Sequence, residues 1–406
     1  MTINKIACII LIAIIALSCK PKQPYQSIQF ENPYKFDSEI REQLEKDTVS
    51  WKHQIAMAEF GNKGDYNKAL KQWDIVFTGK PKPLNNQQID SIRKSLNPVS
   101  AISYITQQAQ SHQVVIINEA HHNSSHRVFT ESLLLELYEK GFKNLGLEAL
   151  SNSIEKDSLL NERGYPSIES GYYIKDPSFG NLVRTALDIG FNVFSYEQTS
   201  NSNGKEREIE QARNIQNFME KHPEEKVLIH CGFDHVLEGN YRNWGKTIAG
   251  TIEEFTGVNP LTINQTKYSE RSEEQFNEPI LNIFDINEPS VLIKQNGSPL
   301  AYKRQESFTD ISVIHPISTF QQKRANWLYG SEKKSVEILL DDLEISFPIM
   351  VLAYFENENF ENAVPTDIIE IETKKDVGYL VLSKGNYSII ASNADNQSIQ
   401  FEMHVK

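Results

Sequence analysis

Short apolar runs alternate with stretches of helical periodicity between residues 113 and 266. Helices are predicted at 129–138, 182–188, 206–221 and 244–255. The apolar runs predict buried strands at 114–117, 145–147, 193–194, 227–229 and 261–263. Strands and helices that alternate in this way form a mostly parallel sheet covered by helices on both faces, so the pattern predicts an α/β fold.

The pattern changes on both sides of this region, which we bound at 111–287. Residues 37–110 have helical periodicity with loop breaks and predict a helical lead-in that packs on the α/β domain. Residues 270–330 fit neither pattern, and we expect loops or an edge there that closes over the α/β site. A small β-sandwich is predicted over 288–406, because six β-type runs separated by turn residues follow one another, at 336–340, 349–355, 368–371, 379–382, 387–391 and 399–405.

The first 36 residues have the features of a leader and a tether. Lys5 precedes an apolar run of twelve residues, 6–17, and small residues lead from this run to Cys19. Twelve residues are too few to cross a bilayer as a helix. The segment 1–18 resembles a bacterial lipoprotein signal peptide; an ordinary secretory signal or a signal anchor is the alternative. The resemblance implies a lipid such as palmitate on Cys19, a tether over 19–36, and a membrane-anchored protein of the bacterial cell envelope that faces the periplasm or the surface.

Composition narrows the classes of partner. The 406 residues contain 41 basic and 54 acidic side chains, a formal net charge of −13, which opposes binding of nucleic acid by the surface as a whole. Of the three cysteines, Cys8 and Cys19 lie in or beside the leader, so Cys231 has no partner for an intrachain disulfide once the leader is removed. The sequence makes no prediction of the oligomeric state.

Polar, mostly ionisable residues follow every predicted strand of the α/β domain. Five of the ten histidines fall in two such windows, 121–126 and 230–235. Ligands of open parallel sheets bind beyond the carboxyl ends of the strands, so these windows predict a site. The candidate catalytic residues are Glu119, His121, His126, Arg127, Glu148, His230 and His235.

These residue types support two kinds of site. A neutral imidazole beside a carboxylate is a general base, so His121 paired with Glu119 or Glu148 could take a proton from water. His235, His230 or Arg127 would then stabilise the developing negative charge, which is hydrolase chemistry without a protein nucleophile. A divalent metal site is the other kind, with His121, His122, His126 and His235 as ligands and the glutamates completing the shell.

Ordinary structural roles compete with these assignments. His230 could be a core histidine bonded to the backbone, and His122 could be a loop residue before a helix. Cys231, beside Gly232, is better explained as a small packed residue than as a thiol nucleophile.

The motifs at the strand ends resemble those of a known superfamily. Glu119-x-His121 with Arg127 follows one strand, Leu147-Glu148-Ala149 the next, and Gly232-x-x-His235-x-x-Glu238 a later one. Together they are similar to the motifs of erythromycin esterases, ChaN-type haem-binding lipoproteins and Tiki/TraB proteases, over about residues 110–266. The resemblance implies that Glu119, His121, Glu148 and His235 line one cleft.

The chain departs from these motifs in two places. Asn118 stands where a glycine usually precedes the glutamate. The consecutive His121 and His122 leave the register open, because a Glu-x-His pattern selects the first and the Glu-x-x-His pattern of the esterases selects the second.

The sequence favours an anchored hydrolase that acts on an ester, lactone or amide in a small molecule or peptide. One alternative is a lipoprotein that holds haem or a metal without turnover, with Tyr172, Tyr173 or Tyr196 near the cleft for haem ligation. In another alternative the α/β domain is only a scaffold, and the β-sandwich is the functional domain that binds a glycan or a protein.

Overall fold

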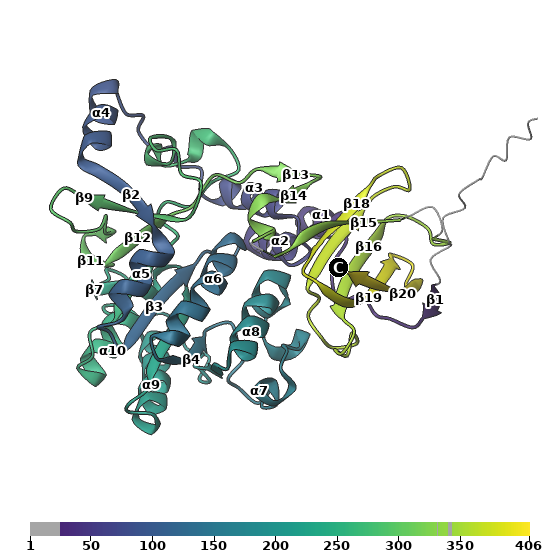
Figure 1. The fold of residues 1–406 in the computed structure, drawn as a ribbon, viewed down its shortest axis with the longest axis horizontal. Coiled ribbons are helices and arrows are strands. Elements are labelled where there is room, and N and C mark those ends of the chain that lie inside the picture. The colour runs from purple at the N-terminus through teal and green to yellow at the C-terminus, as the bar shows by residue number, and fades with distance from the viewer. Residues whose placement is uncertain (1–24, 331, 340–342) are drawn as a thin grey trace, which may run out of the picture.

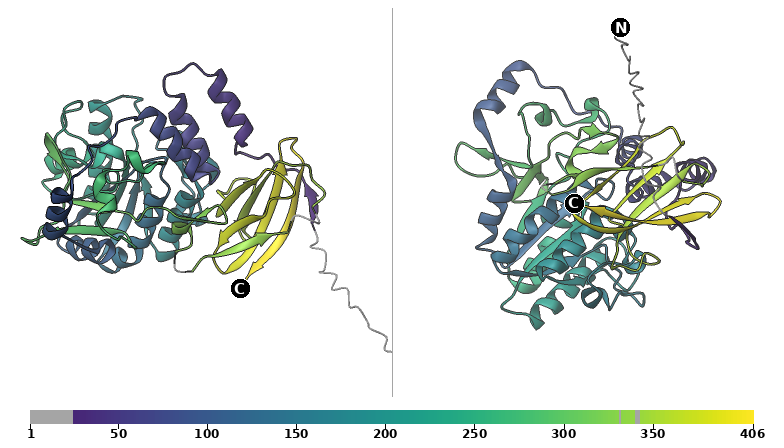
Figure 2. Two further views of the ribbon diagram at one scale, coloured as in Figure 1. Left: turned by 90° about the horizontal axis from the view of Figure 1, so that it is seen from above. Right: turned by 45° about the vertical axis from the view of Figure 1, so that its right-hand side comes forward.

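The computed structural model describes residues 25–330, 332–339 and 343–406. The predicted leader 1–18, Cys19, the first part of the tether and Leu340 of one predicted strand lie outside the described residues. Figures 1 and 2 show an α/β part, a β part that contains the C-terminus, and three helices between them.

An eight-stranded sheet forms the centre of the α/β part and confirms the predicted fold class. Its order is β2-β9-β12-β8-β3-β6-β4-β5, and every pair from β12 to β5 is parallel. All five predicted strands are present. The strands are β2 (Leu96–Ser100), β9 (Ser290–Lys294), β12 (Ile311–Ile314), β8 (Leu261–Asn264), β3 (Val114–Glu119), β6 (Lys226–Gly232), β4 (Phe142–Leu147) and β5 (Asn192–Ser195).

Helices cover both faces of this sheet. Val115 and Ile117 of β3 pack on one face with α5 (Ala101–Ala109), α6 (Ser125–Glu139) and α8 (Pro177–Ile189). Val114 and Ile116 pack on the other face with α9 (Lys205–Lys221) and α10 (Ile248–Thr256). Side chains alternate along a strand, so a run of consecutive apolar residues supplies both cores. The four predicted helices are confirmed, although α10 begins at Ile248 because the chain turns between Tyr241 and Gly245.

The sheet extends beyond the predicted bounds 111–287. The edge strand β2 and helix α5 precede residue 111, and β9 and β12 follow residue 287. Proline weakens a strand prediction because it cannot donate a ladder hydrogen bond, yet an edge strand such as β2 accommodates Pro98. Residues 270–330 therefore supply two sheet strands as well as loops.

Two antiparallel sheets form the β part, and all six predicted runs contain strands. The larger sheet has the order β1-β20-β19-β16-β17 and the smaller one pairs β15 with β18, with one apolar core between them. The edge strand β1 comes from the predicted tether. The strands are β1 (Gln26–Ile28), β20 (Ser398–Val405), β19 (Gly385–Asn393), β16 (Ile349–Phe355), β17 (Asp367–Ile371), β15 (Lys334–Ile338) and β18 (Gly378–Leu382).

The N-terminal helices join the two parts. Figure 1 shows α1 (Asp37–Lys46), α2 (Lys52–Asn62) and α3 (Tyr66–Val76) between the sheets. Lys63, in the turn before α3, pairs with Glu370 of β17 at 2.5 Å, and Asp74 of α3 pairs with Arg271 of the α/β part at 2.5 Å. Both ends of α3 are therefore tied to different parts of the molecule.

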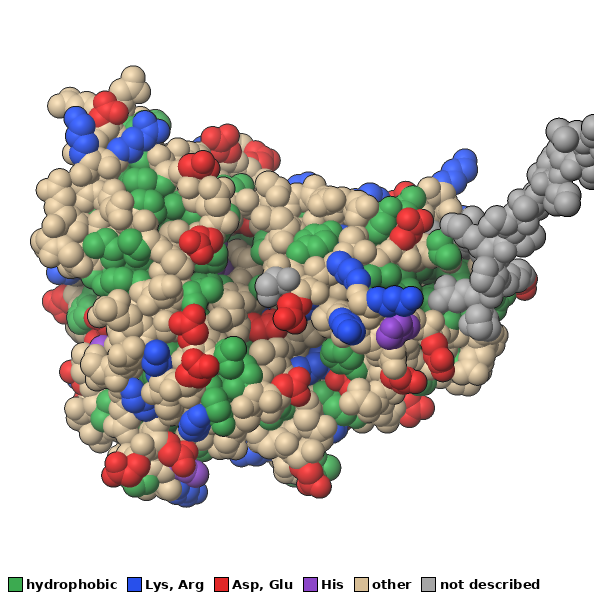
Figure 3. All heavy atoms as spheres, viewed as in Figure 1, with side chains coloured by type: hydrophobic (Ala, Val, Ile, Leu, Met, Phe, Trp, Pro, Cys, Tyr) green, Lys and Arg blue, Asp and Glu red, His purple; other side chains and the backbone are tan. Residues whose placement is uncertain are grey.

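Short elements complete the fold. They are α4 (Asn86–Ser95), α7 (Leu160–Arg163), β7 (Glu238–Asn240), β10 (Lys303–Arg304), β11 (Glu306–Phe308), β13 (Phe320–Gln321) and β14 (Arg324–Ala325), with the 3-10 turns η1 (Ile168–Ser170), η2 (Tyr173–Lys175), η3 (Phe233–Val236), η4 (Glu274–Phe276), η5 (Pro279–Asn282) and η6 (Asn326–Leu328). Among the described residues, no helix has the length and apolar character needed to cross a membrane. Figure 3 shows acidic and basic side chains interspersed on one face of the molecule.

Candidate active site

Three neighbouring strands bring the candidate residues together. Glu119 is the last residue of β3 and lies beside Gly232, the last residue of β6, in the parallel register. Glu148 directly follows Leu147 of β4, which lies beside His230 of β6. Because parallel strands end at the same edge of the sheet, three distant segments converge there.

Glu119 and His121 form a pair at this edge. The Nδ1 atom of His121 lies 2.8 Å from Oε1 of Glu119. Since an ionised carboxylate only accepts hydrogen bonds, Nδ1 carries the proton and Nε2 is left as a proton acceptor. Among the described residues, no side chain or backbone group bonds Nε2. The pair therefore has the orientation that a general base requires.

Arg127 holds Glu119 in place. Its Nε donates to Oε2 at 2.6 Å and one terminal nitrogen donates to Oε1 at 2.8 Å, while the other terminal nitrogen pairs with Asp176 at 2.8 Å. Burial opposes the ionised form of Glu119, but Arg127 outweighs it and lowers the pKa of Glu119 well below its usual value. The sequence predicted that Arg127 stabilises developing negative charge; in the structure Arg127 is buried and each of its three nitrogens has a partner, so it positions Glu119.

Glu148 accepts two hydrogen bonds on the other side of Gly232. The backbone N–H of Gly232 donates to Oε2 at 2.6 Å, and Arg207 of α9 donates to Oε1 at 2.7 Å. Burial would raise the pKa of Glu148, but His235, Arg207 and the Gly232 amide lower it to about 2. Glu148 is therefore an anion that places Arg207 at the site.

His235 lies between two carboxylates and Arg207. Its Nδ1 is 2.6 Å from Oε1 of Glu208, and its Nε2 is 3.0 Å from a terminal nitrogen of Arg207 and 3.5 Å from Oε1 of Glu148. Burial lowers the pKa of His235, but Glu148 and Glu208 outweigh it and raise the pKa above its usual value. Arg207 is the cation of this group and lies between Glu148 and Glu197, next to the His121 pair.

Aromatic rings enclose His121. Tyr173 stacks on its ring with centroids 3.9 Å apart, and Phe233 meets it edge-on at 5.1 Å. Phe233 has φ +38°, in the left-handed region where a bulky residue is strained. In this strained conformation the Phe233 ring contacts the edge of the His121 imidazole.

Gly232 leaves the space that His121 occupies. A Cβ on Gly232 would lie 2.4 Å from Cε1 and 2.5 Å from Nε2 of His121. We expect Gly232→Ala to push the imidazole aside and to slow any reaction in which His121 takes part about 100-fold, the scale expected for misplacing a reacting group by about 1 Å. Kinetics of the purified variant measures this loss.

Gly79→Ala is the matched control, since no atom lies within 4 Å of the added Cβ. The backbone at Gly232, with φ −89° and ψ 148°, suits alanine, so the fold should survive. Wild-type kinetics in Gly232→Ala would show that His121 does not need this space.

His122 points away from Glu119. Its ring stacks on Trp73 of α3 with centroids 4.2 Å apart, and burial lowers its pKa to about 3. The structure therefore pairs Glu119 with the first of the two consecutive histidines, as in a Glu-x-His pattern. Through Trp73 the N-terminal helices contact His122, next to the His121 base.

His126 and His230 belong to the surrounding structure. The Nδ1 of His126 accepts the backbone N–H of Ala120 at 3.0 Å, and Nε2 is 3.1 Å from the hydroxyl of Ser269, so neither nitrogen faces the site. His230 is buried, its Nε2 is 3.8 Å from Glu119, and burial lowers its pKa to about 4. The structure therefore places His126 away from the Glu119–His121 pair, and His230 packs behind Glu119.

The proposed metal ligands do not converge. His121 faces Glu119, His122 stacks on Trp73, His126 bonds Ala120, and His235 bonds Glu208. Over residues 25–330, 332–339 and 343–406, no three His, Cys, Asp or Glu side chains are placed to share a metal ion. The arrangement does not fit the metal site that the sequence offered as an alternative.

Sequence reasoning missed four residues that shape the site. Arg207 and Glu208 of α9 hold Glu148 and His235, Asp176 holds Arg127, and Trp73 holds His122. The charged start of α9, Glu206-Arg207-Glu208, is the one signal that could have drawn attention to this helix.

Glu238, in the same motif as His235, lies outside the site. Its Oε1 accepts the hydroxyl of Thr262 at 2.5 Å, and the same hydroxyl is 3.2 Å from Asp310. Burial raises the pKa of Glu238 from 4.5 to about 7, with a further contribution from Asp310. The Glu238 carboxyl is therefore mostly protonated below about pH 7 in the folded protein.

The raised pKa predicts a pH-dependent effect of Glu238→Gln. A raised folded-state pKa gives stability that is complete below the unfolded value and is lost as pH rises through about 7. Glutamine cannot ionise, so the melting temperature of the variant, relative to wild type, should rise between pH 5 and pH 9. Thermal unfolding at the two pH values measures this, and an unchanged difference would contradict the assignment.

Comparison with known proteins gives only distant matches. No family model and no curated protein matches the chain. The type III effector HopBA1 is similar in structure over 45% of this chain and 94% of its own, with 11% identity and a TM-score of 0.32. RRSP, a MARTX toxin effector domain from Vibrio vulnificus, is similar over 59% of this chain and 48% of its own, with 13% identity and a TM-score of 0.32.

Proposed function

We propose that this protein is a hydrolase in which His121 activates water for attack on an ester, lactone or amide. The observation that carries the proposal is the contact of 2.8 Å between His121 Nδ1 and Glu119, which leaves Nε2 as the free acceptor. Arg127 keeps Glu119 ionised, so the carboxylate is ready to stabilise the imidazolium that forms.

The proposed reaction has two proton transfers. Water attacks the carbonyl carbon while Nε2 of His121 takes one of its protons, which gives a tetrahedral oxyanion. The imidazolium then returns the proton to the departing alcohol or amine, and the carbonyl bond reforms in the acid product. The residues needed are a base fixed by a carboxylate and a cation near the oxyanion.

Arg207 supplies the cation, since its nitrogen donates to Nε2 of His235, which leaves that imidazole as an acceptor. Arg207 is held by Glu148 at 2.7 Å and by Glu197 at 2.5 Å, and its side chain retains 24% exposure. A Cβ on Gly232 would lie 2.5 Å from Nε2 of His121 and 3.5 Å from Oε2 of Glu148, so Glu148 brings Arg207 next to the base. Arg207 thus takes the role that the sequence gave to Arg127.

The motifs support a place in the erythromycin esterase, ChaN and Tiki/TraB superfamily. Glu119, His121, Glu148 and His235, which match its motifs, lie together at one edge of the sheet. The leader supports a lipid on Cys19 and a location in the cell envelope. An anchored hydrolase would act on small molecules or peptides at the membrane surface.

Hydrolysis by the full-length protein tests the proposal. We expect turnover of at least one member of a panel of aryl esters, lactones and peptides, with loss of turnover in His121→Gln. No turnover of any member, with or without added divalent metal, would overturn it.

Haem or metal binding without turnover is less well supported by the side chains. Tyr196 is buried and its hydroxyl donates to the His230 carbonyl at 2.9 Å, while Tyr173 covers a face of His121. A haem titration distinguishes the two functions: a Soret shift that disappears in His121→Ala would favour haem binding.

A further inference from the structure

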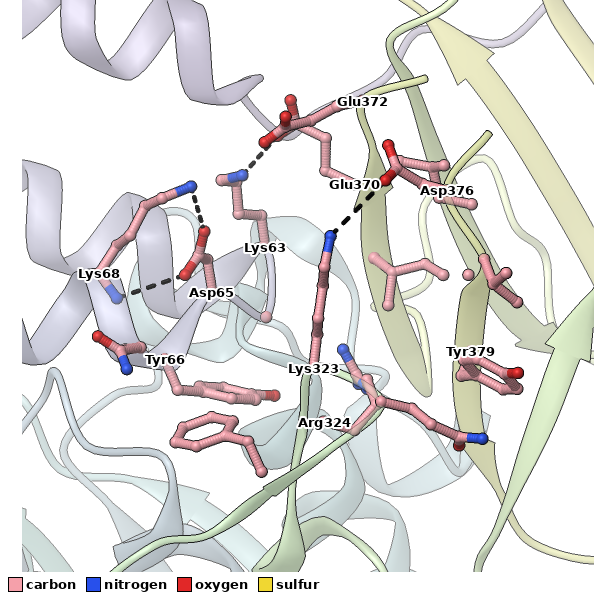
Figure 4. Close-up of a pocket in the computed structure, with 18 of the residues that line it drawn as sticks. Lys63, Asp65, Tyr66, Lys68, Lys323, Arg324, Glu370, Glu372, Asp376 and Tyr379 are labelled. Atoms are coloured by element: carbon pink, nitrogen blue, oxygen red, sulfur yellow. Dashed lines mark hydrogen bonds and ion pairs between the residues drawn. The ribbon is translucent and has the colours of Figure 1, made fainter. Parts of the chain in front are cut away.

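A cavity lies between the N-terminal helices and the β part. Its volume is about 530 Å³, and it is lined by the turn between α2 and α3, the β13–β14 hairpin, and strands β17 and β18. Figure 4 shows Lys63, Lys323 and Asp376 around this cavity. It shares no lining residue with the candidate active site, and we call it the β17-edge cavity.

Strand β17 has a free edge in this cavity. It pairs with β16 on one side and is the last strand of its sheet. The carbonyl of Ile368 accepts a hydrogen bond from Arg324 at 3.3 Å, so it faces away from β16. Alternation along a strand then directs the backbone N–H and C=O of Glu370, and the N–H of Glu372, to the same side.

The edge is covered at one end and open at the other. The turn before α3 covers Ile368, because a Cβ on Gly64 would lie 2.7 Å from the Ile368 carbonyl oxygen. Outside the ladder with β16, and within the part of the chain that the structure describes, no group bonds the backbone N–H or C=O of Glu370. Unpaired backbone groups at the edge of a sheet are a template for another strand.

The residues that line the β17-edge cavity are better suited to binding a peptide than a small ion. The Lys63 side chain is 2% exposed and already pairs with Glu370, and Arg324 pairs with Asp367, so these cations are neutralised. Two apolar side chains at the rim, Phe320 and Val377, are 44% and 52% exposed. The cavity thus offers unpaired backbone groups beside apolar side chains.

We propose that the β17-edge cavity binds an extended peptide that adds as a strand beside Glu370 and Glu372. The two N–H groups donate to peptide carbonyls, and the Glu370 carbonyl accepts a peptide N–H. The open edge matches about three peptide residues at about 3.3 Å each. Alternate peptide side chains contact the apolar rim, and the one between them faces Lys323. This lysine is 84% exposed and its contact with Asp376 is long, at 4.0 Å, so a peptide carboxylate can replace that weak pair. This binding is independent of the proposed hydrolysis.

Loss of a single backbone N–H tests the proposal in the full-length protein. The probe is a fluorescein-labelled peptide of alternating valine and threonine around a central glutamate, and its affinity is measured by fluorescence anisotropy. Glu372→Pro removes the N–H and should weaken binding about tenfold, which is within the range for one hydrogen bond lost with its partner left unpaired. Glu372→Ala keeps the N–H and should bind within about twofold of wild type.

Peptide variants provide the second measurement. N-methylation of the glutamate and its neighbours, which removes peptide donors, should also weaken binding. Equal melting temperatures of the two Glu372 variants would confirm that proline leaves the fold intact, as expected for an exposed residue after the last residue of β17. No binding of the probe at about 1 mM, equal affinity for the proline and alanine variants, or equal affinity of the methylated peptide would each overturn the proposal.

Discussion

Replacing His121 by glutamine should lower kcat/KM for hydrolysis by about 10²–10⁴-fold, the usual contribution of a general base. Glutamine is similar in length and can still hydrogen-bond Glu119, but its side chain has no nitrogen that takes a proton near neutral pH. The buried network around Glu119 should persist, because Arg127 holds that carboxylate independently of the imidazole. Steady-state kinetics with the best substrate of the panel measures the loss.

His404→Gln is the matched control, because His404 lies on the exposed face of β20 and contacts Asn386 there. This variant should retain wild-type kinetics. A loss of less than about threefold in His121→Gln, with the fold intact by circular dichroism, would exclude His121 as the base and with it the proposed mechanism.

Glu119, His121, Glu148 and His235 could be predicted from the sequence because they follow predicted strands. The rule that parallel strands end at one edge turns positions far apart in the sequence into neighbours. Applying the rule requires only the positions of the strands. Strands of a sheet that is covered on both faces appear in the sequence as continuous apolar runs, which are easy to recognise. The same rule also selected His126 and His230, which follow or end strands but turn into the core.

Arg207, Glu208 and Trp73 could not be found in the same way. They lie on helices, and the sequence gives the periodicity of a helix but not which of its residues faces a particular strand end. Helix α3 is the clearest case, because Trp73 reaches His122 only through contacts made by the whole N-terminal segment. The residues of β9 and β12 fall inside the bounds 288–406 predicted for the β-sandwich, but they join the α/β sheet, because a short apolar segment does not reveal which sheet it joins.

Replacing Arg127 by alanine should destabilise the protein by about 3–5 kcal/mol, the usual cost of removing one partner of a buried ion pair. Arg127 is 1% exposed and neutralises both Glu119 and Asp176, so its loss leaves two buried carboxylates without a cation. Urea unfolding at pH 7.5 measures the change. Arg41→Ala is the control: its side chain is 62% exposed beside Asp37, and exposed pairs contribute about 0–1 kcal/mol.

The destabilisation should also depend on pH in a defined direction. In wild type the pKa of Glu119 is held well below its usual value, so the stability that it contributes is present at pH 7.5 and is lost only in strong acid. Burial already raises the pKa of Asp176 in the wild type. Without Arg127 burial also dominates at Glu119 and raises the Asp176 pKa further, so protonation of the two carboxylates stabilises the variant as the pH falls. The difference in unfolding free energy between wild type and Arg127→Ala should therefore shrink between pH 7.5 and pH 5. A difference that stays constant would mean that the lost packing of the arginine side chain against Phe179, rather than the unpaired charge, accounts for the destabilisation.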